Sequence, residues 1–202
     1  MGISVRDFEQ MKARLGGSPR AAAPVASTRR ASSFLAGEVI LGVDPSLRGT
    51  GYGVIRAEKS QYAVLVHGTI VCPAGWERSR CLVKIIQSLR DVLREHKPTV
   101  CVVEGLFYAQ NLKTAIIMGE ARGAAMSVIA EVGLEIFEIA PRKVKQAIVG
   151  HGGAQKLAVA KMVQRMLNLA ELPEPDAADA LALALAHAHE AGRYRLSVPK
   201  KI

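Results

Sequence analysis

This chain of 202 residues contains few aromatic side chains and few cysteines. Phe, Trp and Tyr together make up 4% of it, so Ala, Val, Leu and Ile must fill the core. The three cysteines, Cys72, Cys81 and Cys101, show no CxxC spacing, which argues against both a zinc site and a disulfide framework. We therefore expect reduced, structural thiols in a cytosol-like compartment.

The sequence also lacks a long apolar segment and the apolar core of a secretory leader. Its longest uncharged apolar run, near residues 180–186, is too short and too rich in alanine to cross a bilayer. We therefore expect no membrane partner and a cytoplasmic location. Half of the residues are hydrophobic, which is enough to build the core of one domain.

Positive charge is abundant, and it is unevenly distributed. Of the net charge of +9, residues 1–37 carry +4, residues 193–202 carry +4, and residues 38–192 only +1. This pattern predicts a basic, disordered N-terminal arm, a folded domain over 38–192 and a basic C-terminal tail. Within the domain, an acid-free stretch holds six basic residues: Arg142, Lys143, Lys145, Lys156, Lys161 and Arg165. It favours a nucleic-acid partner over a merely solubilising face.

Hydrophobic periodicity and turn residues predict an α/β fold. Apolar or alternating runs predict strands at 39–44, 50–57, 62–71, 99–104 and 135–139. A period near 3.6 predicts helices at 77–96, 111–132, 142–149, 155–169 and 176–190. The first three strands suit an antiparallel meander, and the uniformly apolar fourth is expected at the centre. The order predicts a mixed five-stranded sheet flanked by helices.

Four acidic residues fall at the ends of these elements. Asp44 and Glu104 each end an apolar strand, while Asp176 and Asp179 open the last helix and share one of its faces. Like charges placed together raise each other's pKa or require a cation, and oxygen-only clusters suit Mg²⁺ or Mn²⁺. The combination predicts two-metal phosphoryl chemistry.

Each acid also has a simpler interpretation when it is considered alone. Asp44 is equally typical of a turn, and Asp176 and Asp179 are typical of a helix cap and first turn. Glu104 is harder to explain in this way, because Glu is rarely buried without a partner. The functional interpretation rests on all of these positions occurring in one small domain.

Several motifs occur in family-like order and spacing: Leu41-Gly42-Val43-Asp44-Pro45, Thr50-Gly51-Tyr52-Gly53-Val54, Val103-Glu104-Gly105-Leu106-Phe107, Gly119-Glu120-Ala121-Arg122-Gly123, Val144-Lys145-Gln146 and Asp176-Ala177-Ala178-Asp179-Ala180. Together with the order of elements, they resemble the ribonuclease H-like nuclease fold and, within it, the RuvC family of Holliday junction resolvases, over about residues 39–190. Ser46 stands where the family commonly has Gly. Both C-terminal acidic positions are Asp, where some members carry one His.

The resemblance implies a catalytic site that holds two Mg²⁺ ions per subunit, with Mn²⁺ as a substitute, on Asp44, Glu104, Asp176 and Asp179. No other cofactor is expected. The implied reaction is the resolution of four-way junction DNA by paired symmetric nicks, in homologous recombination and repair. A homodimer built on the 111–132 helix and a partnership with a branch-migration motor follow from the family alone. Gly119 and Gly123 of that helix suit either a dimer contact or close packing on the sheet.

The DNA-binding candidates are two aromatic and four basic residues: Phe107, Tyr108, Arg142, Lys143, Lys145 and Lys156. The resemblance places Lys145 and Lys156 near the active centre and Phe107 at the junction crossover. Ordinary surface lysines and core packing of Phe107 are the alternatives. For the whole chain, the alternatives are a non-catalytic junction-binding module and a phosphate-binding ATPase of the actin-like or sugar-kinase type. The latter needs a second lobe, for which the chain is too short.

Overall fold

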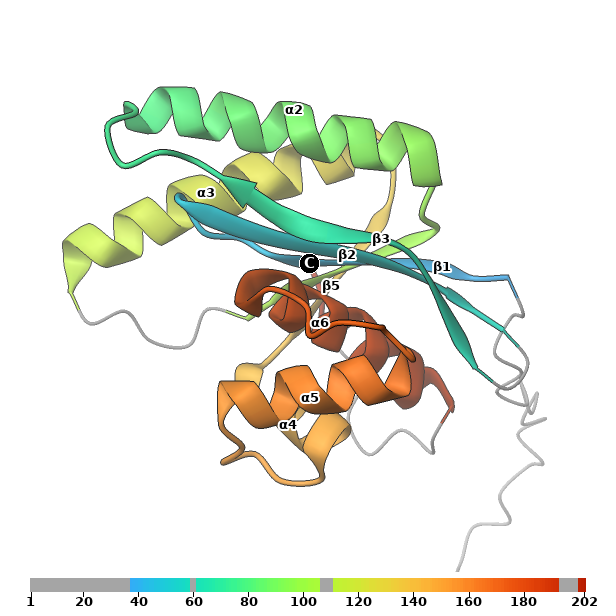
Figure 1. Ribbon diagram of the computed structural model, residues 1–202. Helices are drawn as coiled ribbons and strands as arrows, with labels where there is room; N and C mark the ends of the chain where they lie inside the picture. Colours follow the sequence, from blue (N-terminus) through green and yellow to red (C-terminus); the bar gives the residue numbers. More distant parts are fainter. Residues whose placement is uncertain (1–36, 59–60, 106–110, 193–199) are drawn as a thin grey trace, which may run out of the picture. The chain divides into compact units, whose positions relative to one another are not determined.

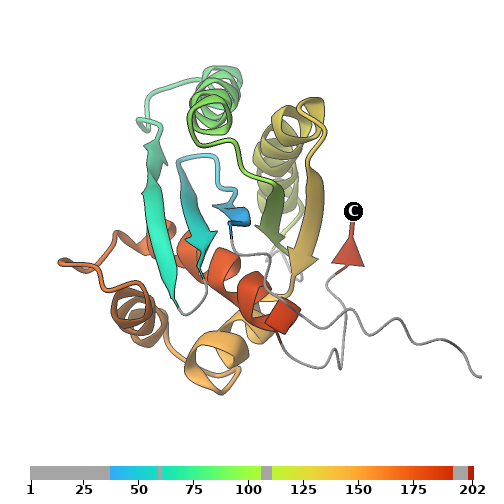
Figure 2. The ribbon, with the colours of Figure 1, turned by 90° about the vertical axis from the view of Figure 1, so that its right-hand side faces the viewer.

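The computed structural model describes residues 37–58, 61–105, 111–192 and 200–202. A six-stranded mixed sheet lies between two layers of helices (Figures 1 and 2). The strands are β1 (Val39–Asp44), β2 (Gly49–Ala57), β3 (Tyr62–Val71), β4 (Val100–Glu104), β5 (Glu135–Ile139) and β6 (Lys200–Lys201). The helices are α2 (Arg78–His96), α3 (Leu112–Glu131), α4 (Pro141–Val149), α5 (Lys156–Met166) and α6 (Pro175–Gly192). Every predicted element is present, with boundaries close to those expected.

The sheet has the order β3-β2-β1-β4-β5-β6. As predicted, β1, β2 and β3 form an antiparallel meander and β4 occupies the interior of the sheet. Strand β1 runs parallel to β4, which in turn runs parallel to β5. Because β1 and β4 are parallel neighbours, with Val43 opposite Val103, their carboxyl ends meet at the same edge. This arrangement places Asp44 and Glu104 side by side in the topology.

Strand β6 corrects the expectation of five strands and a separate tail. Lys200 and Lys201 pair antiparallel with Glu138 and Phe137 of β5, and the Lys201 ammonium forms an ion pair with Glu135. The two lysines carry no strand pattern of their own, so the sequence offered no signal for this pairing. The pairing covers the backbone edge that β5 otherwise leaves open.

Local signals in the sequence explain where the helices begin and end. The side chain of Asn111 caps α3 by accepting a hydrogen bond from the Thr114 amide at 2.9 Å. Pro141 is the first residue of α4, where its missing amide hydrogen costs nothing. Helix α4 ends at Gly150, whose φ of 91° lies in the left-handed region that favours glycine.

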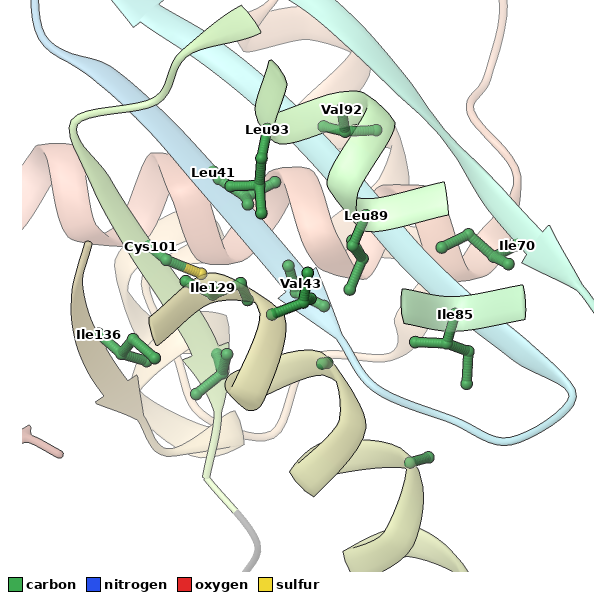
Figure 3. Close-up of a cluster of buried hydrophobic side chains, with 14 of the residues drawn as sticks. Leu41, Val43, Ile70, Ile85, Leu89, Val92, Leu93, Cys101, Ile129 and Ile136 are labelled. Carbon is green, nitrogen blue, oxygen red and sulfur yellow. The ribbon is translucent and has the colours of Figure 1, made fainter. Parts of the chain in front are cut away.

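On one face of the sheet, α2 and α3 cover a core of large aliphatic side chains (Figure 3). Leu41 and Val43 of β1 meet Ile85 and Leu89 of α2, and Ile129 of α3 lies beside them in the same cluster. The three cysteines are buried and unbridged, as the sequence predicted. We call this side the α2/α3 face.

On the opposite face, α6 lies against the sheet and α4 and α5 pack on α6 (Figure 1). The core here includes Ile40, Val102 and Ile139 from the strands and Leu181 and Leu183 from α6. The alanines of α6 between positions 177 and 188 are buried almost completely. We call this side the α6 face. Among the described helices, none combines the length and apolar character needed to span a membrane.

Candidate active site

Two of the predicted acids are brought to one edge by the strands that carry them. Asp44 is the last residue of β1, and Glu104 is the last residue of β4. Side chains alternate between the two sheet faces along a strand. Val43 and Val103 point into the α2/α3 core, so Asp44 and Glu104 belong to the α6 face. Both side chains are partly buried there.

Helix α6 supplies the other two acids because its backbone comes unusually close to the sheet. A Cβ atom at Gly51 would lie only 1.9 Å from the main-chain oxygen of Asp176, and one at Gly42 only 2.0 Å from that of Ala180. No residue with a side chain fits at these positions without moving the helix. The glycines of β1 and β2 therefore let the first turns of α6, with Asp176 and Asp179, rest on the acidic edge.

The four carboxylates share one electrostatic environment. Burial raises the pKa of Asp44 to about 6, and the charges of Asp179 and Asp176 add to this shift. Burial likewise raises the pKa of Glu104 to about 7, with further contributions from Asp44 and Asp179. Burial raises the pKa of Asp176; Lys156 lowers it in part, and Asp179 raises it further. Carboxylates whose charges raise the pKa of a neighbour in this way are close enough to compete for a proton or to share a cation.

A lysine provides the positive charge within this cluster. The Nζ atom of Lys156, at the start of α5, lies 2.6 Å from Oδ2 of Asp179. That hydrogen bond is the main cause of a raised pKa for Lys156, and the ammonium lowers the pKa of both Asp44 and Glu104. The Lys156 side chain remains 71% exposed, so it can leave this position without unpacking the core.

Beside the ion pair lies a cavity of about 260 Å³. Its polar lining consists of Glu104, Asp179, Lys145 and Lys156, and its apolar lining consists of Pro141, Val144, Val159 and Leu183. Lys145 reaches the site from α4 and opposes the raised pKa of Glu104. The cavity lies among β4, α4, α5 and α6, and its lining sets two lysines beside two acids.

The four acids are near one another but do not form a ready-made ligand cage. Within the described residues, no group of three or more His, Cys, Asp or Glu side chains is arranged to hold a metal ion as it stands. The donor chemistry nevertheless fits a hard divalent cation, because every candidate ligand is a carboxylate and the repulsion among them favours added positive charge. An ion held by Asp179 would have to displace the Lys156 ammonium from its Oδ2 atom.

Two of the other predicted residues lie outside this cluster. Arg142 and Lys143 are exposed at the start of α4, and the Arg142 side chain extends over Gly152. Neither residue lines the cavity. Phe107 and Tyr108 fall outside the described residues.

Sequence reasoning missed three features of the structure. The apolar wall of the cavity was not predicted, because Val144, Val159 and Leu183 look like ordinary core residues in a helical pattern. Behind the sheet, Arg122 bonds to the main chain of Glu104; because α3 also carries Lys113, Glu120 and Glu131, the sequence did not single out Arg122 for this contact. A second cavity, of about 650 Å³ between β3 and the 169–174 loop, had no sequence signal at all.

The fold and the site together define a class of protein. Acids that end the first and fourth strands, joined by acids of the last helix, characterise a nuclease of the ribonuclease H-like class. Comparison with known proteins identifies the family within this class. The family described as crossover junction endodeoxyribonuclease RuvC matches residues 40–187. The chain therefore belongs to the RuvC family.

Individual relatives agree with this assignment. The RuvC of Syntrophomonas wolfei is 45% identical over 159 residues, which cover 78% of this chain and 91% of the relative. That of Rubrobacter xylanophilus is 42% identical over 152 residues, which cover 75% and 85%. The structure of Thermus thermophilus RuvC in complex with a Holliday junction substrate matches with a TM-score of 0.75 and 31% identity, over 82% of this chain and 99% of that chain.

Proposed function

We propose that this protein is a structure-selective DNA endonuclease that resolves four-way junctions by paired symmetric nicks in homologous recombination and DNA repair. The observation that carries the proposal is the meeting of carboxylates from the ends of β1 and β4 with two from the start of α6, in a chain of the RuvC family. The Thermus structure with its junction substrate supports four-way DNA as the substrate. Family membership also favours the nuclease over the ATPase alternative.

The proposed cofactor is a pair of divalent ions, Mg²⁺ with Mn²⁺ as a substitute. Asp44, Glu104, Asp176 and Asp179 would hold them. When bound, such ions lower the pKa of a water to give the nucleophile and stabilise the leaving 3′ oxygen, so that the products carry a 5′-phosphate and a 3′-hydroxyl. The carboxylate-only donor set and the raised pKa values of Asp44 and Glu104 support this assignment.

The lysines of the cavity act on the scissile phosphate in this proposal. Lys145 and Lys156 line the same cavity as Glu104 and Asp179, so their ammonium groups can neutralise a phosphate placed there. When Lys156 turns from Asp179 to the phosphate, it frees a carboxylate for metal and contributes charge to DNA affinity in the same movement. Arg142 and Lys143 extend the basic surface from α4, and Phe107 with Tyr108 is proposed to meet the unstacked bases of the crossover.

A homodimer is part of the proposal, and helix α3 is its proposed interface. Leu112 and Ile116 are 76% and 49% exposed. Gly119 and Gly123 follow on the same side, and a Cβ atom at either glycine would meet nothing within 4 Å. In this structure the glycines therefore do not serve close packing on the sheet. A two-fold dimer would place one active site on each of two like strands of a two-fold junction. A branch-migration motor is the proposed further partner.

Residues 1–37 are proposed to be a basic arm outside the nuclease domain of 38–192. Deleting them is expected to leave a folded, metal-dependent nuclease, because the deletion stops before β1. Loss of the +4 charge should weaken DNA binding mainly at low salt and make the slope of log affinity against log salt shallower. Insolubility of the truncated protein, or loss of junction selectivity at matched salt, would contradict a separate arm.

The direct test is incubation of the protein with a synthetic four-way junction and with a matched duplex, each with and without Mg²⁺. We expect paired nicks in strands of like polarity, only in the junction and only with the metal. Binding without cutting at any Mg²⁺ or Mn²⁺ concentration would instead indicate the non-catalytic module. An ATP-hydrolysis assay on the same preparation separates the remaining alternative.

A further inference from the structure

Arg122 is a buried charge that the proposed chemistry does not use. Of the polar and charged residues in the described ranges, Thr50 and Arg122 are those classed as buried, and Thr50 bonds locally to Ser46. The Arg122 side chain, in the middle of α3, is only 11% exposed. Burying a guanidinium is costly unless it has good partners, so its contacts call for an explanation.

Those contacts join the ends of two parallel strands. The Nη1 atom of Arg122 donates a hydrogen bond to the main-chain oxygen of Glu104, the last residue of β4. Its Nη2 atom donates to Oε2 of Glu138 in β5 at 2.5 Å. Next to this fork, the Gly105 amide donates to the Ile139 oxygen at 2.9 Å. The guanidinium thus fastens the end of β4 to β5 immediately before the chain leaves the sheet.

Arg122 makes these two contacts on the side of the sheet opposite to the proposed active site. Ile136 of β5 belongs to the α2/α3 core, so Glu138, two residues later, points to that same face. The Glu104 carboxylate points to the α6 face, where it meets the field of Asp44 and Asp179. Arg122 therefore holds the backbone of Glu104 from behind and leaves its carboxylate free in front.

The neighbouring residues are fitted to this arrangement. A Cβ atom at Gly105 would lie 3.3 Å from Cγ of Glu138, which is closer than most side chains tolerate, so glycine lets Glu138 reach the guanidinium. Only arginine offers two parallel donors in a fixed plane, one for each acceptor. A lysine at this position would reach one acceptor at a time.

We infer that Arg122 and Glu138 form a clamp that positions Glu104, so that Arg122 is a positioning residue for the cleavage reaction although it touches neither DNA nor the reacting atoms. The contacts of Arg122 are those of the structure; only the catalytic role of Glu104 rests on the proposed function. In addition to the ladder that pairs Glu104 with Ile139, the guanidinium fixes the Glu104 carbonyl oxygen where the chain leaves the sheet. Misplacement of such a group by about 1 Å can cost on the order of 100-fold in rate.

The test compares Arg122→Lys with the parent in two measurements. The first is the single-turnover rate of junction cleavage, which we expect to fall about 10- to 100-fold. The second is Mn²⁺ affinity, followed by the electron paramagnetic resonance signal of free Mn²⁺ without DNA, which we expect to weaken about 10-fold. Junction affinity in Ca²⁺ should not change, because the DNA-binding lysines are untouched. Glu138→Gln, which keeps an acceptor for the guanidinium, should show the same effects in milder form.

Two controls separate positioning from general stability. Val128→Ala removes buried volume from the same helix without touching the strand ends, so it provides a protein of matched melting temperature with an intact clamp. Arg78→Lys makes the same chemical change in an exposed ion pair with Glu120 of α3. Neither control should alter Mn²⁺ affinity or the cleavage rate well below its melting temperature.

The outcomes are distinct. Parent-like cleavage and Mn²⁺ affinity in Arg122→Lys would overturn the clamp, and so would losses that Val128→Ala reproduces at equal stability. If Arg122→Lys does not fold, Glu138→Gln decides by the same two measurements. If the parent binds Mn²⁺ but does not cut junctions, the proposed function fails, while the Mn²⁺ comparison still supports or overturns the clamp.

Discussion

The two faces of the sheet are built from different side chains and do different work. On the α2/α3 face, large aliphatic residues such as Leu89 and Ile129 fill the space between helix and strand, as Figure 3 shows. On the α6 face, glycines of the strands meet the alanine-rich helix almost backbone to backbone, as at Gly42 and Ala180. The large side chains keep α2 and α3 at an ordinary packing distance from the sheet. The glycines let the backbone of α6 come much closer to it.

This difference explains why the acids gather on one face only. A carboxylate at a helix start interacts with one at a strand end only when both backbones are close, because Asp and Glu side chains are short. The small residues under α6 bring Asp176 and Asp179 into the field of Asp44. From the α2/α3 face, the guanidinium of Arg122, paired with Glu138, bonds to the backbone of Glu104. In the proposed function, the α6 face carries the catalytic carboxylates and the α2/α3 face supports them through the Arg122 clamp.

The largest expected effect comes from removing a charge on the α6 face. Glu104→Gln should reduce junction cleavage on the order of 10³-fold or more, because a neutral amide is a poor metal ligand. Junction binding, measured by gel shift in Ca²⁺, should stay near the parent value, since affinity comes from basic residues. Glu131→Gln, in an exposed ion pair with Arg90, is the matched control. Cleavage near the parent rate would remove Glu104 from the site.

A methyl group between α6 and the sheet should have the next largest effect. In Gly51→Ala the new Cβ would meet the Asp176 oxygen at 1.9 Å, so the helix start must move outward. We expect cleavage to fall about 100-fold through displaced carboxylates. Gly75→Ala adds the same methyl group where nothing lies within 4 Å, and its cleavage should match that of the parent. Equal behaviour of the two variants would show that close packing does not position the acids.

Much of this architecture could be predicted from the sequence because its signals are local. Apolar runs, the cap at Asn111 and the stop at Gly150 each act within a few residues. Asp44 and Glu104 were recognisable because each follows directly on a buried strand. The parallel pairing of those strands then follows from their order in the fold.

The contacts around the acids could not be predicted, because they depend on how separate elements are placed against each other. That Lys156 would meet Asp179 depends on the angle between α5 and α6. That Arg122 would meet Glu104 and Glu138 depends on the register of β4 and β5 under α3. Strand β6 could be predicted least, since its two lysines have no strand pattern and form a strand only by pairing with the edge of β5.

A smaller effect is expected on stability in the absence of metal. Burial, with Asp44 and Asp179 adding to it, raises the pKa of Glu104 from 4.5 to about 7. Between these values the folded protein keeps a proton that the unfolded chain loses, so stability falls as the pH rises through this window. Glu104→Gln resembles the protonated acid and should therefore raise the free energy of unfolding at pH 8 by about 1 to 3 kcal/mol.

The same variant should gain almost nothing at pH 4, where the carboxyl of the parent is protonated in both states. Chemical denaturation at the two pH values, with a chelator present, measures the difference. Glu131→Gln changes a carboxyl that is 58% exposed and is paired with Arg90, which stays charged at both pH values, so it should show no such dependence on pH. A gain of equal size at pH 4 and pH 8 would mean that charge is not its cause.

The smallest expected effect contrasts one methylene group on each face. Ile129→Val on the α2/α3 face and Ile139→Val on the α6 face should each lower the free energy of unfolding by about 0.5 to 1.5 kcal/mol, because both side chains are buried in well-packed cores. Cleavage at a temperature well below melting should be unchanged for Ile129→Val, since Ile129 belongs to the α2/α3 core and does not line the cavity beside the acids. For Ile139→Val we expect the cleavage rate to fall a few-fold, because Ile139 pairs with Glu104 and packs in the α6 core beside the cavity wall.

Denaturation midpoints and single-turnover rates, measured on the same samples, separate the effect on stability from the effect on cleavage. Equal loss of cleavage in both variants would show that the two faces are mechanically coupled, and that the division between support and chemistry does not hold at this scale.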